Sequence, residues 1–472
     1  MTQAKTPASA GQLSLISVLT FACAYLPFAA LQTSVAVQVP RFFAGHLGLG
    51  LAVGGVFGLV RLIDIPLDPA LGLGMDRTRT RLGRYRPWML LGAPVLMLAI
   101  YKLYQAEIGI STSYLLVWLL IMYLGMSMLL LAANSWASTL ATSYKQRSRI
   151  FGAMAGLGTL GAVAILVIPI VVAQSGGADA DGIRAVGWFL VGLVPITIGL
   201  AALRTPEPLK KAQHAHFAIR DYVGLLARPN VLRLIAADFL VTLGPGWMSA
   251  LYLFFFKDSR GFSTTAANAL LVIYIAAGLM GAPATAWLAN RTNKHRALMA
   301  TTTGYSLMLV VIFLSPKADF LIAAPAMFVA GALAAGTVVM IRSITADVGD
   351  EIRLEKGQQQ IGLLYALTSA TTKAASALAI TLTFAVLAFV GYNPSEGAAN
   401  GPEQVRGLEL AYTIGPIIFV MLGGACFLGY KLTAARHAEI RRQLDERDAL
   451  YDEAPIIESV TSAPGEVAAS RS

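Results

Sequence analysis

Three ionisable residues, Arg61, Asp64 and Asp68, lie inside one long apolar run, at spacings of three, four and seven residues. On a helix these spacings place them on one face. Because charge within a membrane is costly, such a face is expected to point into a helix bundle or a water-filled cavity and to serve a function. Two carboxylates one turn apart repel each other unless a cation lies between them, so the pair can bind and release a proton or a metal ion. The alternative is that Arg61 neutralises one aspartate and the group only holds helices together.

Lys373 is a second charge placed well inside an apolar run, among small and hydroxyl residues. An ammonium group at that depth needs an anionic partner, and we expect it to pair with Asp64 or Asp68. The alternative is that Lys373 extends to the membrane interface. Asp238 and Arg342 lie close to the expected cytoplasmic ends of their runs, where an interfacial position is the favoured interpretation.

Polar and aromatic residues in two other runs are candidates for solute binding. Trp136 lies close to Asn134 and Ser138, and Tyr25 lies two helical turns from Gln32. A tryptophan next to polar groups can stack on a sugar ring while the sugar hydroxyls bind the polar groups. The alternative for Trp136 is a role in packing or in the aromatic belt of the membrane interface.

The composition indicates what kind of element must hold these residues. Of the 472 residues, 56% are hydrophobic and only 13% are charged. Soluble domains average about 25% charged residues, so lipid is the expected solvent and the bilayer the expected partner. The net charge of +10 comes from Lys and Arg in short loops, as membrane topology requires, so no nucleic-acid partner is expected. Metal-ligand and nucleophile motifs are lacking, so we expect neither an enzyme nor a bound cofactor.

Twelve apolar runs have about the 20 residues that are needed to cross the hydrocarbon core of a bilayer. They cover residues 13–39, 47–74, 87–104, 112–141, 150–174, 186–203, 233–256, 264–288, 298–315, 320–345, 359–391 and 408–430. Lys and Arg concentrate in alternate connecting segments, which predicts that both termini are cytoplasmic. No cleavable signal is evident before the first run. We therefore expect an all-α, multi-pass protein of the bacterial inner membrane that functions as a monomer.

The longest internal polar stretch divides the twelve runs into two sets of six. The expected organisation is a cytoplasmic N-terminal tail (1–12), a six-helix bundle (13–203), a central loop (204–232), a second bundle (233–432) and a partly disordered tail (433–472). A short repeat supports the division, because Asp76-Arg77-Thr78 follows the second run and Asn290-Arg291-Thr292 follows the eighth. Two related halves with a site between them suit an alternating-access carrier. We expect a conformational latch in these loops that uses the side chains of Asp76, Arg77, Arg84, Asn290 and Arg291.

The sequence resembles the glycoside–pentoside–hexuronide:cation symporters, the melibiose-permease branch of the major facilitator superfamily. The resemblance is carried by RLIDIPLDPALGLGMDRTRTRLGRYRPW (61–88), by the position of Lys373, by DVGDEIRLEKG (347–357) and by RHAEIRRQLDER (436–447). It implies the major facilitator fold, with twelve helices in two pseudo-symmetric halves. It also implies that Asp64 and Asp68 form the cation site beside Lys373 and that Trp136 lies against the sugar.

Several positions depart from the family pattern. The first helix lacks the acid with which the family binds sugar, and the corresponding part of the fourth helix reads Leu130-Leu131-Ala132-Ala133. Leu129 stands where some members have a sodium-coordinating hydroxyl, and Met154 stands where the family has an arginine. These departures predict a substrate other than melibiose and favour H+ over Na+ as the coupling ion. The expected function is cation-coupled symport of a sugar, glycoside or related small polar solute. The alternatives are a carrier of a non-sugar solute and a non-transporting membrane sensor.

Overall fold

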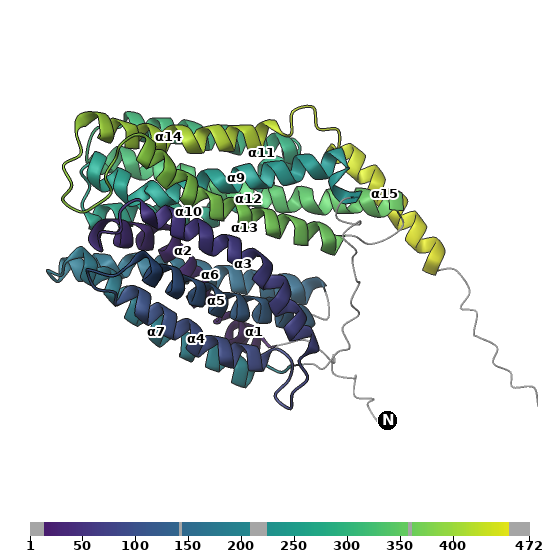
Figure 1. The fold of residues 1–472 in the computed structure, drawn as a ribbon. Coiled ribbons are helices and arrows are strands. Elements are labelled where there is room, and N and C mark those ends of the chain that lie inside the picture. Colours follow the sequence, from purple (N-terminus) through teal and green to yellow (C-terminus); the bar gives the residue numbers. More distant parts are fainter. Residues whose placement is uncertain (1–13, 141–143, 208–223, 357–360, 453–472) are drawn as a thin grey trace, which may run out of the picture.

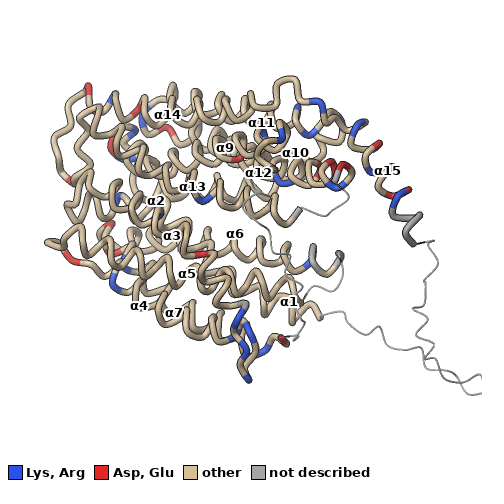
Figure 2. Tube along the Cα trace, turned by 45° about the vertical axis from the view of Figure 1, so that its right-hand side comes forward, with Lys and Arg blue, Asp and Glu red and all other residues tan. Residues whose placement is uncertain are grey.

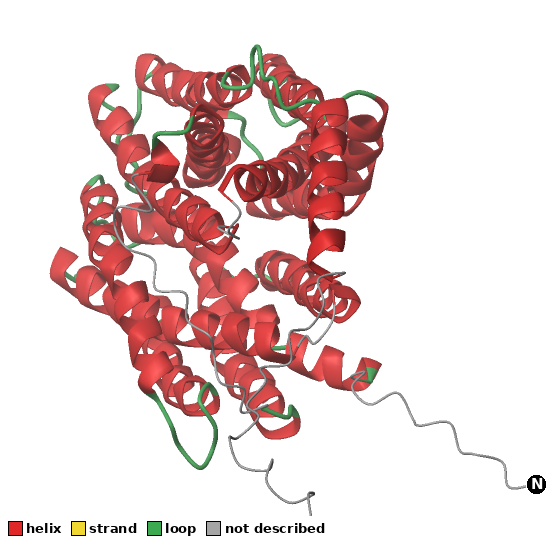
Figure 3. Cartoon of the chain, turned by 90° about the vertical axis from the view of Figure 1, so that its right-hand side faces the viewer, coloured by secondary structure: helices red, strands yellow, loops and turns green. Residues whose placement is uncertain are grey.

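The computed structural model describes residues 14–140, 144–207, 224–356 and 361–452. In these ranges the regular elements are helices joined by loops, and the sole β-bridge pairs Thr80 with Gly83 (Figure 3). Disorder is predicted for residues 451–472; helix α15 reaches Asp452, and residues 453–472 lie outside the described ranges.

The N-terminal half of the chain contains the helices α1 to α7. The first crossing combines three consecutive helices: α1 (Leu15–Ala22), α2 (Tyr25–Arg41) and the π-helical η1 (Phe42–His46). The crossings that follow are α3 (Ala52–Arg77), α4 (Arg86–Tyr104), α5 (Thr112–Leu140), α6 (Tyr144–Gln174) and α7 (Asp179–Arg204).

The C-terminal half repeats this plan with α9 to α14. Its first crossing is α9 (Pro229–Phe254), which again continues into a π-helical turn, η2 (Phe255–Ser259). The others are α10 (Thr264–Arg291), α11 (Lys294–Leu314), α12 (Phe320–Lys356), α13 (Ile361–Phe389) and α14 (Pro402–Ala425), followed by the polar helix α15 (Ala434–Asp452). The corresponding π-helical turns at the ends of α2 and α9 are a second sign that the halves are related.

Within the described residues, 11 helical segments are long and apolar enough to cross a membrane. Helix α3 is not among them, although its 26 residues suffice for a crossing, because it carries Arg61, Asp64 and Asp68. Figure 2 shows that charged residues gather at the two ends of the bundle and are sparse between them. The chain is therefore a multi-pass membrane protein, as the composition predicts.

Several helices extend beyond the apolar runs that predicted them. Helix α7 begins at Asp179 rather than near residue 186, and α12 continues through the charged segment 346–356 instead of ending at residue 345. Hydropathy locates the part of a helix that suits lipid. It misses the charged turns that continue the same backbone hydrogen bonding outside the apolar core.

The two halves lie side by side, with α15 at one end of the bundle (Figure 1). Helix α3 of the first half packs against α13 of the second. Two glycines of α3 permit this approach. A Cβ atom at Gly54 would collide with the Phe384 side chain, and one at Gly58 would collide with Thr381. The Thr381 hydroxyl donates a hydrogen bond to the Gly54 carbonyl at 3.1 Å. This contact brings the charged face of α3 against the second half.

Candidate functional site

The charged face of α3 meets Lys373 of α13. The Lys373 ammonium forms an ion pair with Asp68 and lies 3.8 Å from Asp64 Oδ2. Arg61 Nη1 lies 3.4 Å from the same Asp64 oxygen. The expected pairing of Lys373 with the acids of α3 is confirmed, and it joins the two halves. We refer to Arg61, Asp64, Asp68 and Lys373 as the central charge cluster.

Asp64 is the more enclosed of the two acids, with 2% of its surface exposed. Helix α5 supplies part of its surroundings, because the Ser127 hydroxyl donates to Asp64 Oδ1 at 3.4 Å. The Arg61 guanidinium lies over the Tyr123 ring, 4.0 Å from its centroid, where the π face attracts a cation. The sequence reasoning missed Ser127 and Tyr123. The available signal was two hydroxyl side chains four residues apart in a long apolar run.

Asp68 keeps an unused acceptor. Its Oδ2 atom binds Lys373, whereas its Oδ1 atom is buried and has no hydrogen-bond partner among the described residues. An unpartnered buried carboxylate oxygen is costly, and a proton or cation bound there would remove that cost. The central charge cluster pairs two carboxylates with two cationic side chains, so it is close to neutral overall. Adding or removing one positive charge therefore changes which partners Lys373 prefers.

Tyr25 and Asn134 come together as a polar pair between α2 and α5. The Tyr25 hydroxyl donates a hydrogen bond to the Asn134 amide oxygen, and both residues are partly exposed. Gln32 is exposed and makes no hydrogen bond with the described residues, so it does not join this pair. Ser138 donates to the Asn134 carbonyl within its own helix.

The structure does not place Trp136 where it could stack on a solute. The residue is fully buried, and its indole Nε1 donates to the Pro206 carbonyl at 3.1 Å. Phe21 meets the ring edge-on, with the centroids 5.4 Å apart, and the Arg86 guanidinium lies 5.5 Å from the ring centroid. In this conformation the ring packs the α15 end of the first half, and contact between Trp136 and a sugar stays a prediction.

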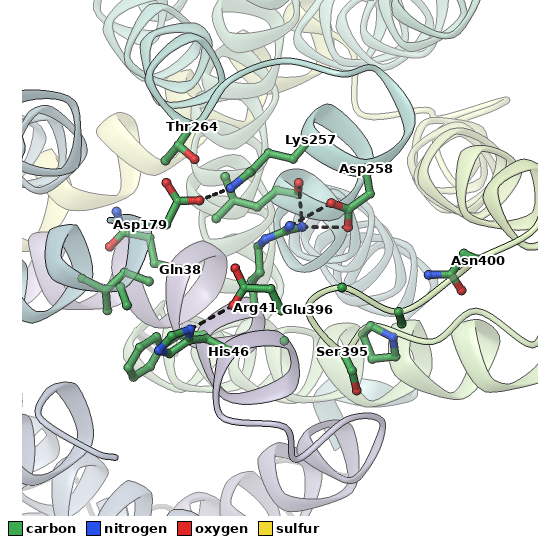
Figure 4. A pocket seen from close by; sticks show the side chains of 18 of the residues that line it. Gln38, Arg41, His46, Asp179, Lys257, Asp258, Thr264, Ser395, Glu396 and Asn400 are labelled. Atoms are coloured by element: carbon green, nitrogen blue, oxygen red, sulfur yellow. Dashed lines mark hydrogen bonds and ion pairs between the residues drawn. The ribbon is translucent and has the colours of Figure 1, made fainter. Parts of the chain in front are cut away.

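A second charge cluster lies at the end of the bundle opposite α15 and was not predicted (Figure 4). Arg41, at the end of α2, forms a two-pronged ion pair with Asp258 of η2, with N–O distances of 2.9 and 2.8 Å. Lys257 of η2 forms an ion pair with Asp179 at the start of α7. The Tyr392 hydroxyl donates to Asp258 Oδ2 at 2.7 Å.

A further pair completes this cluster. His46 Nδ1 lies 2.9 Å from Glu396 Oε2, and the Glu396 amide donates to the Gly45 carbonyl at 3.1 Å. All three contacts, the ion pairs Arg41–Asp258 and Asp179–Lys257 and the His46–Glu396 hydrogen bond, connect one half to the other. They surround a cavity of about 320 Å³. We call these six residues the interhalf ionic cluster; it ties the halves together at this end.

The chain matches the family described as MFS/sugar transport protein over residues 20–434. It belongs to that family. The match covers most of both halves, so the fold is the major facilitator fold with two six-helix halves, and the protein is a transporter rather than an enzyme.

Characterised relatives and solved structures agree with this assignment. The chain is 25% identical over 439 residues to the isoprimeverose transporter of Lactiplantibacillus pentosus, covering 89% of this chain and 90% of that protein. It is 26% identical to the lactose permease of Lactobacillus delbrueckii subsp. bulgaricus, covering 87% of this chain and 68% of that protein. A crystal structure of the nucleoside transporter NupG superposes with a TM-score of 0.64 at 13% identity, covering 89% of this chain and all of that one.

In this MFS/sugar transport protein Glu207 holds the basic loop before α4, a contact that the sequence did not predict. The Glu207 carboxylate accepts hydrogen bonds from the backbone N–H groups of Arg84, Tyr85 and Arg86, at 2.5, 2.8 and 3.3 Å. A carboxylate is stabilised at a helix N-terminus by these N–H groups and by the helix dipole. The Asp76 side chain, the acceptor that the sequence suggested, lies outside the described part of the structure.

Two other latch residues, Arg84 and Arg291, make contacts within their own half. Arg84 Nε donates to the Met75 carbonyl at 3.1 Å, and the Arg77 side chain is exposed. In the second half Asn290 is exposed, and the Arg291 guanidinium stacks over Trp287, 4.3 Å from the ring centroid. A latch between the halves through these residues therefore stays a prediction, and the contacts that the structure shows for them are local.

The interfacial interpretation of Asp238 is wrong for this structure. Asp238 of α9 is 5% exposed and accepts a hydrogen bond from the Thr372 hydroxyl of α13 at 3.0 Å. Arg342 of α12 is exposed, yet it lines the same cavity as Asp238. Helix α9 begins at Pro229, nine residues before Asp238, which places this acid deeper in the bundle than the apolar run suggested.

Proposed function

We propose that this transporter couples the inward movement of H+ to uptake of a small polar solute, a sugar or glycoside, across the bacterial inner membrane. The observation that carries the proposal is the central charge cluster. One of its acids, Asp68, bonds a lysine of the opposite half through one oxygen and leaves the other oxygen without a partner among the described residues. The names of the relatives, an isoprimeverose transporter and a lactose permease, support the solute class.

The proposed cycle is a shift between two conformations. Protonation of Asp68 removes the charge that holds Lys373, and Lys373 then relies on Asp64, 3.8 Å away. The contact between α3 and α13 weakens or reorients, and the halves rock about it. Solute and proton leave together on the opposite side. In this proposal solute binds more favourably when Asp68 is neutral, so the proton and the solute cross the membrane in the same direction.

The choice of H+ over Na+ follows from the donor set. Sodium is a hard cation that needs several oxygen ligands, and hard-cation sites in proteins assemble about six of them. Here both carboxylates already contact cationic side chains, and the Ser127 hydroxyl lies at the long distance of 3.4 Å from Asp64. A proton needs only one free oxygen. Na+ remains the competing proposal, and the ion dependence of uptake decides between them.

The proposed orientation places α15 and both chain termini in the cytoplasm. Basic residues of the 77–86 loop, the start of α11 and α15 lie at that end of the bundle, which agrees with the positive-inside rule. The interhalf ionic cluster is then at the outer face. Because it ties the halves together there, the structure corresponds in this proposal to a state closed toward the outside. The protein is proposed to work as a monomer.

Proteoliposomes that contain the purified full-length protein test the proposal. Uptake of radiolabelled isoprimeverose, lactose, D-xylose and D-glucose is measured under an imposed pH gradient, an imposed Na+ gradient, or neither. We expect accumulation above equilibrium of at least one sugar with the pH gradient and none with the Na+ gradient alone. Accumulation driven by Na+ at constant pH would show that the coupling ion is Na+ rather than H+. No accumulation of any of the sugars under either gradient would contradict sugar symport.

A further inference from the structure

A cavity of about 390 Å³ lies entirely within the C-terminal half, apart from the central charge cluster and the interhalf ionic cluster. Helices α9, α10 and α12 form most of its wall, and α13 contributes Thr372. Small-molecule sites in proteins are typically cavities of about 300–1,000 Å³ with a few convergent polar groups. The polar side chains that line this cavity are Asp238, Thr242, Tyr274, Tyr305, Thr337, Arg342 and Thr372.

Asp238 is the carboxylate among these groups. Only 5% of its surface is exposed, and in the described part of the chain its one hydrogen-bond donor is the Thr372 hydroxyl. An ionised carboxylate can accept about four hydrogen bonds. A carboxylate at this depth is costly unless donors approach it, so intramembrane acids mark functional positions. Further hydrogen-bond donors can reach Asp238 from the cavity.

The charges of the cavity indicate what kind of solute fits. Arg342 lines the wall with Asp238 and attracts its carboxylate electrostatically, although no direct ion pair joins the two among the described residues. Arg342 would repel a cationic solute, and Asp238 would repel an anionic one. A neutral solute with several hydroxyl groups can donate hydrogen bonds to the carboxylate and accept them from the guanidinium. Tyr274, which is partly exposed, offers aromatic surface to the CH groups of such a solute.

Helix α13 connects this cavity to the central charge cluster. Thr372 and Lys373 are consecutive, yet the Thr372 side chain binds Asp238 of α9 and the Lys373 side chain binds Asp68 of α3. A shift or rotation of α13 that follows from a change at Lys373 would therefore also move the donor to Asp238. Solute affinity and cation binding are then linked through one helix, as coupling requires.

We propose that this cavity is the solute-binding subsite, that Asp238 is its anchoring carboxylate, and that it takes a neutral polyhydroxylated solute. The proposal rests on the proposed function and deepens it, because the sugar-binding acids expected on the first and fourth helices are absent from this chain. It places solute recognition mainly on the second half of the transporter.

Entrance counterflow in proteoliposomes measures solute recognition without a cation gradient. The labelled sugars are D-xylose, D-glucose, isoprimeverose and lactose, and the variants are Asp238→Asn and Thr372→Val. The matched control is Asp319→Asn, which changes a carboxylate in the loop before α12, outside the cavity. For the sugar that the wild type carries, we expect Asp238→Asn to raise the half-saturation concentration about tenfold or more, because a charged hydrogen-bond partner is lost. Thr372→Val should raise it less, and the control should leave it unchanged.

A labelling assay reads the cavity itself and does not depend on transport. Val338 lines the cavity and is 57% exposed, so a cysteine placed there, with Cys23 and Cys426 changed to serine, should react with a maleimide. The transported sugar should slow this reaction, and Asp238→Asn should abolish the protection while the labelling itself persists. The persistence shows that the variant is folded. If Asp238→Asn cannot be reconstituted, Thr372→Val and the protection of Val338→Cys decide the outcome.

The outcomes separate the two proposals. One set of results overturns the subsite but leaves sugar transport standing. In it the wild type shows counterflow, and either Asp238→Asn has an unchanged half-saturation concentration or the sugar gives no protection at residue 338. A wild type that exchanges none of the sugars, and shows no protection by any of them, overturns the proposed function and the subsite with it.

Discussion

Lys373 of α13 and Asp68 of α3 form an ion pair that joins the two halves of the transporter, and Asp64 lies 3.8 Å from the same ammonium group. The lysine therefore has a second acid within reach when the first is neutralised. Neutralisation of Asp68 can therefore change the contact between the halves while the Lys373 ammonium keeps an anionic partner.

The first prediction concerns Asp68→Asn. Asparagine cannot take up a proton, but its amide oxygen can still accept a hydrogen bond from Lys373, so the variant should fold and insert. We expect uphill uptake driven by a pH gradient to fall to background, while counterflow of the same sugar continues. The control is Glu107→Gln, an exposed acid between α4 and α5. Concentrative uptake by Asp68→Asn equal to that of wild type would refute the coupling role.

The second prediction concerns the interhalf ionic cluster. Arg41 and Asp258 are 22% and 32% exposed, so solvent screens their pair, and we discount its contribution to about 1 kcal/mol. Replacing Arg41 with Gln should shift the equilibrium between the closed and open outer face by about fivefold. Pulsed EPR between spin labels at positions 107 and 317, one on each half, measures the shift as a larger population of long distances.

Two further variants make this test specific. Arg184 pairs with Asp181 at 3.7 Å within α7, at the same end but inside one half, so Arg184→Gln should leave the distances unchanged. The exchange of both charges, Arg41→Asp with Asp258→Arg, should recover part of the closed population. Equal effects of Arg184→Gln and Arg41→Gln would show that the cluster does not control opening.

The central charge cluster could be predicted from the sequence because intramembrane charge is scarce and costly. A lysine far inside one apolar run has few possible partners, and the two acids of α3 are the strongest of them. The helical spacing of Arg61, Asp64 and Asp68 fixed their common face. Ser127 could not be chosen by the same reasoning, since a single hydroxyl in an apolar run is inexpensive and its orientation depends on how α5 packs.

The remaining site residues depend on tertiary approach. Arg41 and Lys257 resemble ordinary charges at helix ends. Only the contacts of η2 with α2 and with α7 show that they pair across the halves. Trp136 has the residue type that suits sugar stacking, but Phe21 and Arg86, remote in the sequence, occupy its surroundings. The depth of Asp238 follows from where α9 begins, which hydropathy does not define to within a turn.

The third prediction is a pH dependence at the outer face. Burial, together with the neighbouring Asp258 carboxylate, raises the pKa of Tyr392 above its ordinary value. The phenol group is therefore more stable in its neutral form in the folded protein, and its hydrogen bond to Asp258 is complete below a pH of about 10. The contribution is lost only as the pH rises through the higher folded-state pKa. The outer face should not open between pH 7 and pH 10 through this residue.

NMR of tyrosine labelled with ¹³C at Cζ measures this titration, and Tyr392→Phe assigns the signal. We expect the Tyr392 resonance to stay at its neutral position beyond pH 10. A midpoint at or below 10 would show that the phenol is solvated and that the bond to Asp258 is not maintained in the membrane-embedded protein.

The fourth prediction concerns α15, which docks on the C-terminal end of α12. Ile440 and Leu444, one turn apart, are buried in a cluster with residues of α9, α11 and α12. Leu444→Ala removes buried apolar surface and should weaken docking by about 2–5 kcal/mol. Hydrogen–deuterium exchange should then accelerate across α15. Arg442→Ala is the matched control, because Arg442 is exposed and its ion pairs among the described residues, with Glu439 and Glu446, lie within α15. Exchange that accelerates equally in both variants would show that the apolar face does not hold the helix and that its local ion pairs do.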